Sequence, residues 1–209
     1  MNIKLTVLAK SDKHTGFCVA GIDESGKFIR LVRDKEGHAL GKEQCKFKKM
    51  DFLTVDTTSV PLRHQKENHI LNQIVQFSKS TMSIENLKKY IQNPEFVFLN
   101  TNPWLIEKEI NTQKISLLLV EVTDLHIYKN NEGKYKCDFN YNNHNYKGFS
   151  VTDPEFKLKN QKISKAIILV SLPDSPYNRY GSELYYKFVC AVYPLQNHKK
   201  SYLFDCYKI

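Results

Sequence analysis

The sequence predicts a mainly β protein with one minor helix, arranged as two small β-barrels in tandem. Residues 135–141 alternate aromatic or apolar side chains with polar ones, the period of two expected of a half-buried strand. Short turns rich in Asn and Gly, at 130–133 and 142–145, separate this run from its neighbours and are typical of hairpins. An acidic–Gly–Lys–aromatic turn opens a strand in each half, at 24–28 and 132–135. Packed hairpins favour a small barrel or sandwich over a helical or βαβ domain.

The size and composition of the chain allow two small domains. Its 209 residues suffice for one large β domain or two small ones. A hydrophobic content of 41% supplies a core, and an aromatic content of 12% suits strands, where aromatic side chains pack well. A charged segment at 107–114 follows the first set of predicted elements. We therefore predict a first barrel with one helix over residues 1–106 and a second barrel over residues 107–209.

The first half contains short strand patterns bounded by turns. We expect strands at residues 3–9, 17–22, 27–33 and 52–56, with a polar, lysine-rich loop at 34–50. One helix is predicted after the N-cap residue Ser83, because Ile84, Leu87 and Ile91 follow with helical spacing and Pro94 ends the pattern.

The second half reads almost entirely as strands and turns. We expect strands at residues 117–122, 135–141, 146–151, 166–172, 185–193 and 202–207. The unbroken apolar run at 117–122 indicates a strand that is buried on both faces. A loop at 173–182 carries Tyr177, Arg179 and Tyr180.

The charge and the cysteines indicate the partner and the compartment. A formal net charge of +9 and a pI near 9.2 point to an anionic partner, with nucleic acid first and a basic but inert surface as the alternative. The five cysteines are odd in number and form no CxxC pair, which predicts free thiols in a reducing compartment. No signal-peptide pattern or membrane-spanning stretch is present in the sequence. We therefore expect a cytoplasmic protein without membrane contact.

The first half offers a group of candidate nucleic-acid contacts. Five-stranded barrels of this length include the OB-fold, which binds oligonucleotides on one sheet face and its adjoining loops. Single-stranded nucleic acid requires a basic groove and exposed aromatic rings on which bases stack. Phe28 and Arg30 share one strand face, and the nearby candidates are Lys13, His14 and Arg33. The alternative places Phe28 in the core and Arg30 at the barrel rim.

The second half offers fewer candidates. Tyr135, Phe139 and Tyr141 share one strand face, which we interpret as core. Lys134 and Lys136 then point outward, where they are candidate phosphate contacts.

A dense polar cluster, residues 64–69, is the other candidate site. Gln65 and Asn68 could contact nucleic acid, and Glu67, His69 and the distant Asp153 are weak catalytic candidates. The two histidines are five residues apart, which differs from the spacing of a HExxH zinc site, so we predict no metal and no cofactor. The structural interpretation is a turn whose side chains bond to the backbone at a barrel end. We favour a binding protein, with a nucleic-acid-processing enzyme as the alternative.

Several motifs in a fixed order resemble the dual OB-containing domain family. They are LTVLAKSDKHTGFCVAGID, KFIRLV, HQKENH, FVFLN, YNNHNYKGFSVTDPEF and LVSL followed by YYKFVCAVYP. The resemblance spans nearly the whole chain. It departs from the family at Phe28 and Leu31, where the family usually has Trp and Pro.

The resemblance implies a tandem OB architecture and nucleic-acid binding in bacterial DNA modification, repair or defence. It implies no catalytic mechanism. Apart from the resemblance, a further alternative is an adaptor that docks a partner enzyme, such as a nuclease or helicase, through its β-edges or aromatic loops. The positions that match the family's motifs are Arg30, Gln65, Glu67, Asn68, His69, Thr152 and Asp153.

Overall fold

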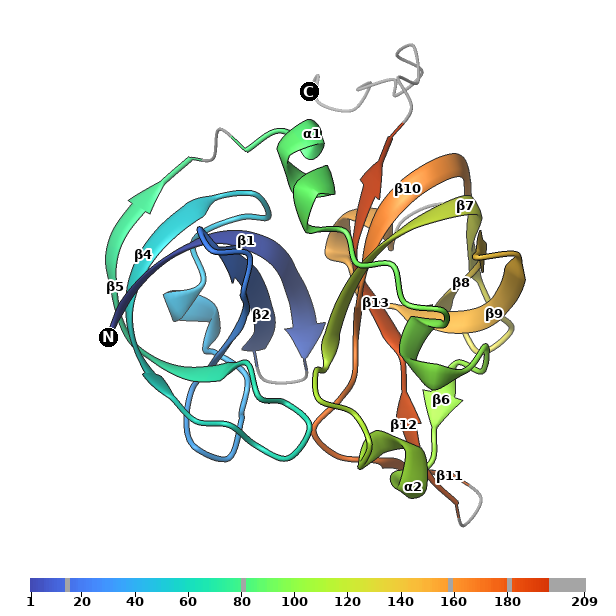
Figure 1. The fold of residues 1–209 in the computed structure, drawn as a ribbon, viewed down its shortest axis with the longest axis horizontal. Helices are drawn as coiled ribbons and strands as arrows, with labels where there is room; N and C mark the ends of the chain where they lie inside the picture. The colour runs from blue at the N-terminus through green and yellow to red at the C-terminus, as the bar shows by residue number, and fades with distance from the viewer. Residues whose placement is uncertain (14–15, 80–81, 158–159, 180–181, 196–209) are drawn as a thin grey trace, which may run out of the picture.

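Two closed five-stranded barrels lie side by side in the computed structural model, which describes residues 1–13, 16–79, 82–157, 160–179 and 182–195 (Figure 1). The strands of the first barrel are β1 (Asn2–Lys13), β2 (Gly16–Asp23), β3 (Phe28–Val32), β4 (Phe52–Ser59) and β5 (Asn68–Ser78). The strands of the second barrel are β7 (Leu117–Lys129), β8 (Tyr135–Tyr141), β9 (His144–Val151), β10 (Gln161–Ser171) and β13 (Phe188–Pro194). The predicted mainly β fold with tandem barrels is confirmed.

Both barrels have the same strand order. The first runs β1–β2–β3–β5–β4 and closes through pairing of β4 with β1. The second runs β7–β8–β9–β13–β10 and closes through pairing of β10 with β7. In each barrel the third and fifth strands pair in parallel, and the other neighbours are antiparallel. This is the Greek-key barrel of the OB-fold.

Alternate strand residues fill the first barrel. Val7 of β1, Val19 of β2 and Leu31 of β3 point inward, and each is at most 1% exposed. The segment that was predicted to be a polar loop, residues 34–50, contains a short 3-10 helix, η1 (Lys42–Gln44), and also places Phe47 in this core. Four of its five lysines are exposed, whereas the Lys49 side chain is 10% exposed and pairs with Asp153. Leu40 and Cys45 join Phe47 in the core and anchor the segment.

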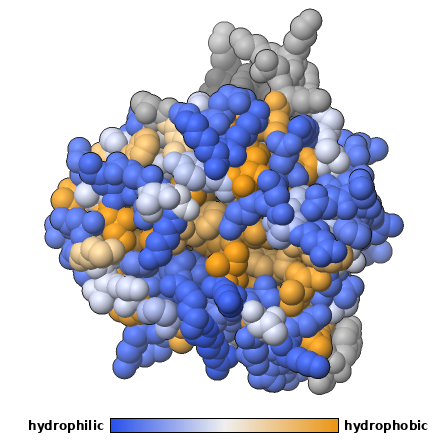
Figure 2. Space-filling view, viewed as in Figure 1, coloured by the Kyte–Doolittle hydropathy of each residue, from blue (hydrophilic) through white to orange (hydrophobic). Residues whose placement is uncertain are grey.

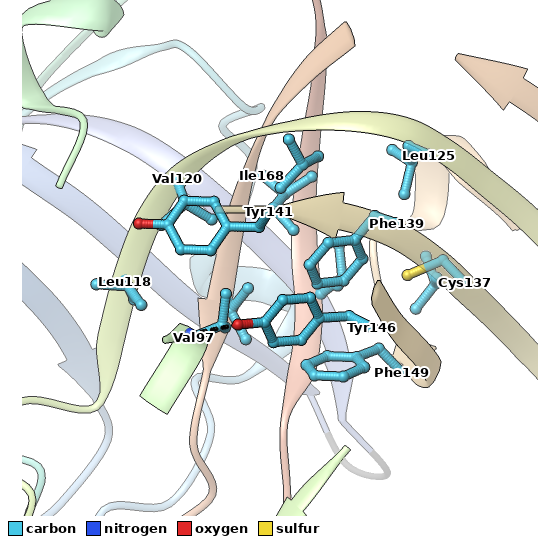
Figure 3. Close-up of a cluster of buried hydrophobic side chains, with 14 of the residues drawn as sticks. Val97, Leu118, Val120, Leu125, Cys137, Phe139, Tyr141, Tyr146, Phe149 and Ile168 are labelled. Atoms are coloured by element: carbon cyan, nitrogen blue, oxygen red, sulfur yellow. Dashed lines mark hydrogen bonds between the residues drawn. The ribbon is translucent and has the colours of Figure 1, made fainter. Parts of the chain in front are cut away.

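An aromatic cluster fills the second barrel (Figure 3). Phe139 and Tyr146 stack with their ring centroids 5.0 Å apart, and Phe149 meets Phe139 edge-on at 5.1 Å. The Tyr146 hydroxyl accepts a hydrogen bond from the backbone N–H of Val97, so its polar group is satisfied inside the core (Figure 3). The aromatic stripe of β8 is therefore core, as the sequence predicted.

A third apolar cluster lies between the barrels and consists of residues that point out of each one. Ala20 and Ile22 of β2 pack there with Leu117 and Leu119 of β7, and each is at most 4% exposed. Because Leu118 points into the second barrel, β7 is buried on both faces, as predicted. Hydrophobic residues gather in the middle of the face seen in Figure 2, where the two barrels meet. The barrels therefore share an apolar interface.

The segment between the barrels contains α1 (Ile84–Leu87), η2 (Lys88–Tyr90), η3 (Val97–Leu99), β6 (Trp104–Leu105) and α2 (Glu107–Ile110). The Ser83 hydroxyl accepts a hydrogen bond from the Asn86 backbone N–H at 3.2 Å, which confirms the predicted N-cap. Leu87 enters the inter-barrel cluster, whereas Leu105 and Ile110 belong to the core of the second barrel. The division at residues 106 and 107 stays a prediction, because this segment contacts both barrels.

A small sheet of order β11–β12–β6 flanks the second barrel. Its strands β11 (Tyr177–Arg179) and β12 (Ser182–Tyr186) lie between β10 and β13 in the chain, and η4 (Pro154–Phe156) follows β9. The single strand predicted at 185–193 is two strands, which separate at Lys187. The sequence also missed β5, because its side chains after Leu71 are mostly exposed and polar. The strand predicted at 202–207 lies outside the described residues.

Candidate nucleic-acid interface

A cleft of about 820 Å³ opens between the two barrels. The first barrel contributes the ends of β1 and β2, strand β3 and the segment 37–42. The second barrel contributes the segment 171–178 and residues of β13. Cys18, Arg30 and Val32 line the cleft from the outward side of β2 and β3. In OB-fold barrels, this side of the second and third strands binds oligonucleotides.

Charged side chains of both signs line the rim of the cleft. Lys13 Nζ lies 3.6 Å from Asp174 Oδ1, so this ion pair joins β1 to the segment that follows β10. Lys42 lines the cleft as well and is exposed. Exposed ion pairs contribute about 0–1 kcal/mol, so Lys13 can exchange its partner for a phosphate oxygen with little loss of stability. The predicted contact His14 lies outside the described residues.

Arg30 lies at the floor of the cleft and connects the barrels. It is 8% exposed, and its guanidinium donates to Ser116 Oγ at 2.7 Å and to Ser171 Oγ at 3.3 Å. Its Nη2 also lies 3.6 Å from the Glu67 carboxylate, which accepts a hydrogen bond from the Ser116 hydroxyl. A phosphate contact would have to displace these bonds. Direct contact between Arg30 and nucleic acid stays a prediction, and the contacts seen are structural.

The polar cluster at 64–69 bonds to the backbone of the second barrel. His64 Nε2 lies 2.7 Å from the Pro173 carbonyl oxygen, and Gln65 Nε2 donates to the Leu172 carbonyl at 3.1 Å. Asn68 Nδ2 donates to Gln65 Oε1 at 3.1 Å and holds that side chain in place. Burial lowers the pKa of His64, so the neutral ring donates its Nε2 proton to Pro173. This arrangement matches the structural interpretation of the cluster, although Gln65 also lines the cleft.

The weak catalytic candidates each have a different partner. Glu67 pairs with Arg30, as described above, and His69 Nδ1 lies 3.3 Å from the hydroxyl of Thr57. The Asp153 carboxylate is 1% exposed and accepts hydrogen bonds from Lys49 Nζ and from the Val192 backbone N–H, both at 2.9 Å. The Lys49–Asp153 contact joins the barrels, the His69–Thr57 contact lies within the first barrel, and the three side chains do not meet in one open site.

Phe28 lies beside a second, smaller hollow of about 150 Å³. Its ring points out of the first barrel, is half-buried and packs against the inter-barrel cluster, so it lies between the two alternatives predicted for it. Lys27, Lys66 and Lys114 line the hollow together with Glu67, whose charge Arg30 already balances. The surface of the hollow is mostly apolar, and three lysines adjoin it. Lys27 and Lys66 adjoin predicted candidates in the sequence, but nothing there indicated Lys114.

The remaining predicted cations lie on the surface. Lys134 is exposed and lies 3.0 Å from Glu132, whereas Lys136 is half-buried and donates to Ser150 Oγ at 2.9 Å. Arg33 is exposed, and its Nε donates to Asp34 Oδ2 at 3.2 Å. Lys134 and Lys136 point out of the second barrel, as expected, whereas Arg33 lies apart from both hollows. Their contact with phosphate stays a prediction.

One loop of the first barrel brings potential metal ligands together. Asp34, Glu36 and His38 each offer one ligand atom, and these atoms lie within 4.8 Å of one another on a loop of the first barrel. Asp34 already pairs there with His38 Nδ1 at 2.8 Å, which accounts for the grouping as an ordinary loop contact. In the described ranges, no helix has the length and apolar character needed to cross a membrane.

The two five-stranded barrels and the cleft between them define a protein with tandem OB barrels. The chain belongs to the dual OB-containing domain family, whose model matches residues 3–192. Searches of curated proteins and of solved structures found no significant match. The family confirms the resemblance found in the sequence and suggests a nucleic-acid-binding role.

Proposed function

We propose that the protein binds single-stranded or locally distorted nucleic acid along the seam between its two barrels, with little sequence preference. The observation that carries this proposal is the 820 Å³ cleft on the β2–β3 side of the first barrel, the side that OB-folds use for oligonucleotides. Lys13 and Lys42 lie at this cleft. The hollow around Phe28, which Lys27, Lys66 and Lys114 adjoin, lies on the other side of the Arg30–Glu67 pair.

Weak sequence preference follows from the chemistry of the seam. Its cations are mainly lysines, which act as point charges on phosphates and carry no base information. Binding should therefore weaken with salt, with a log–log slope near −0.7 for each phosphate neutralised on a single strand.

Fluorescence anisotropy with labelled single- and double-stranded DNA and RNA at two salt concentrations tests the proposal. Replacing Lys27, Lys66 and Lys114 with Gln should weaken binding and reduce the salt slope by about two units if all three contact phosphates. The matched control replaces three exposed lysines outside both hollows, Lys46, Lys108 and Lys162, with Gln. If both triple variants lose the same affinity, the loss is due to net charge and not to these three positions. Binding that does not weaken with salt would contradict the proposal.

Phe28→Ala tests stacking at the hollow. If a base stacks on this ring, binding should weaken by about 1–3 kcal/mol. Because Phe28 also packs against the inter-barrel cluster, thermal unfolding of the variant is measured beside binding. If Phe28 has only a packing role, binding should weaken only where the variant is also less stable. Phe28→Leu retains apolar packing but lacks the ring, so it should keep the stability and lose the stacking contribution.

On the family resemblance, we also propose a role in bacterial DNA modification, repair or defence, alongside a partner nuclease or helicase. Affinity purification from a native host tests this role. Recovery of such an enzyme with the wild-type protein supports it, and recovery of nucleic acid alone speaks against a partner enzyme.

A further inference from the structure

Aromatic side chains line one face of the small sheet beside the second barrel. Trp104 of β6 pairs with Tyr186 of β12, so these two side chains share a face. Tyr177 of β11 pairs with Leu184, two residues before Tyr186, and therefore points to that face as well. Tyr185 points the other way and is 4% exposed. The sheet thus has a buried side and an aromatic side.

The three rings on the aromatic side form a row, which we call the aromatic ladder: Trp104, Tyr186 and Tyr177. The ring centroids of Trp104 and Tyr177 lie 6.1 Å and 6.0 Å from that of Tyr186, and both contacts are edge-to-face. Trp104 is 36% exposed and Tyr177 is 54% exposed. Among the aromatic residues that the structure describes, only Phe77 is similarly exposed. The ladder therefore holds two of the three rings classed as exposed among the described Phe, Tyr and Trp residues.

The ladder is supported by a buried lysine. Lys187 follows Tyr186 and is fully buried, and its Nζ donates to the Val97 carbonyl at 2.7 Å and to the Asn100 carbonyl at 2.8 Å. Its backbone N–H donates to the Pro103 carbonyl at 2.9 Å. These bonds fix the chain that leads into Trp104. A ring held in place before binding loses little conformational freedom when a ligand stacks on it.

The surroundings of the ladder favour a polyanion. Lys136 Nζ lies 5.9 Å from the Tyr186 ring centroid, which places a positive charge beside the rings. Tyr177 also lines the inter-barrel cleft, so the ladder begins where the cleft ends. Exposed rings next to cationic side chains are the combination that binds unpaired bases together with their phosphates. A duplex keeps its base faces inside the stack and cannot use such a surface.

We propose that the aromatic ladder is a stacking platform for the unpaired bases of a single strand that leaves the inter-barrel cleft past Tyr177. This inference rests on the proposed function and adds to it the selection of single strands. Trp104 and Tyr177 supply the stacking surfaces, and Tyr186 spaces them. Lys136 neutralises phosphate beside them.

The sequence contains one tryptophan, Trp104, so tryptophan emission, excited at the red edge where the tyrosines absorb little, reports on the ladder. The wild-type protein is titrated with a deoxythymidine oligomer, a duplex of the same length and a neutral oligosaccharide. The single strand should quench Trp104 emission with the midpoint found by anisotropy, and the duplex and the oligosaccharide should leave the emission unchanged. Tyr177→Ala should weaken single-strand binding about 5- to 150-fold, the range for loss of one stacked base.

Phe77→Ala is the matched control, because Phe77 is 49% exposed and lies on β5 of the first barrel, outside the ladder. Trp104→Phe, which retains a ring of smaller area, should weaken binding less than Trp104→Ala. If the wild type binds single strands while Trp104 emission stays constant and Tyr177→Ala behaves like Phe77→Ala, the ladder proposal is overturned and the proposed function stands. Quenching by the oligosaccharide alone also overturns the ladder proposal. If the protein binds no nucleic acid at all, both the ladder proposal and the proposed function are wrong.

Discussion

Removing the positive charge of Arg30 should destabilise the whole molecule. Arg30→Met retains most of the apolar stem but loses the bonds to Ser116 and Ser171. It also leaves the Glu67 carboxylate, whose side chain is 7% exposed, without its cation. The change therefore removes the polar contact between the barrels while it keeps most of the apolar stem.

The expected magnitude follows from that burial. Removing one partner of a buried ion pair costs about 3–5 kcal/mol, because the other charge stays buried and uncompensated. For a protein of this size, each 1 kcal/mol lowers the melting temperature by about 2–4 °C, so Arg30→Met should lower it by roughly 6–20 °C. The control is Arg33→Met, which removes an exposed ion pair with Asp34 and should cost about 0–1 kcal/mol.

Urea unfolding followed by circular dichroism measures both variants. The double variant Arg30→Met/Glu67→Leu should recover much of the loss, because an apolar pair can replace a buried ion pair with little change in stability. If Arg30→Met unfolds like Arg33→Met, the structural role assigned to Arg30 is wrong. If Arg30→Met instead keeps full stability and loses nucleic-acid binding, the sequence-based prediction of direct contact is the correct one.

Three further predictions concern other parts of the fold. Burial lowers the pKa of Lys187 from 10.5 to about 7, so between these pH values the unfolded chain holds a proton there that the folded chain lacks. The unfolding free energy of the wild type relative to Lys187→Met should therefore rise with pH in this window, by up to about 1.4 kcal/mol per unit, in urea titrations at pH 7, 8 and 9. Gly16→Ala would place a Cβ atom 1.9 Å from the Leu40 carbonyl oxygen, so it should lower the free energy of unfolding by about 1–3 kcal/mol, measured by thermal unfolding. Gly41→Ala is the control, because its Cβ atom would meet only the flexible side chain of Glu43, and it should lower the free energy of unfolding less. Asp153→Asn weakens the charged hydrogen bond from Lys49 and should cost about 1.5–3 kcal/mol in the same assay, with no change expected for the exposed lysine control variants.

Local patterns predicted the barrels well, because most of their strands show an inward face directly in the sequence. The alternation in β8 and the turns beside it identified Phe139 and Tyr141 as core. The same alternation could not show which outward faces are covered by the other barrel. The outward residues Ile22 and Leu119 are also apolar, and a strand that is apolar on both faces is expected to be buried on both faces. This pattern indicated that the outward face is covered, but it did not identify the other barrel as the cover.

The candidate site depended on contacts between distant residues, which the sequence does not display. Arg30 looked like a surface cation because its partners Ser116 and Ser171 are 86 and 141 residues away. The aromatic ladder joins Trp104 to strands that begin more than 70 positions later, and its register follows from strand pairing alone. Strand β5 escaped prediction because most of its second half is exposed and lacks a regular apolar period.

The inter-barrel cluster also determines how the two barrels can share one ligand. Binding modules on a flexible linker gain avidity that depends on the length of that linker. Here Ala20 and Ile22 are packed against Leu117 and Leu119, so the second barrel cannot move away from the first without exposing apolar surface. The two barrels therefore present one rigid footprint. If the protein binds nucleic acid as proposed, the number of nucleotides covered should be a fixed property of the protein, and lengthening the segment between the barrels should not extend its reach.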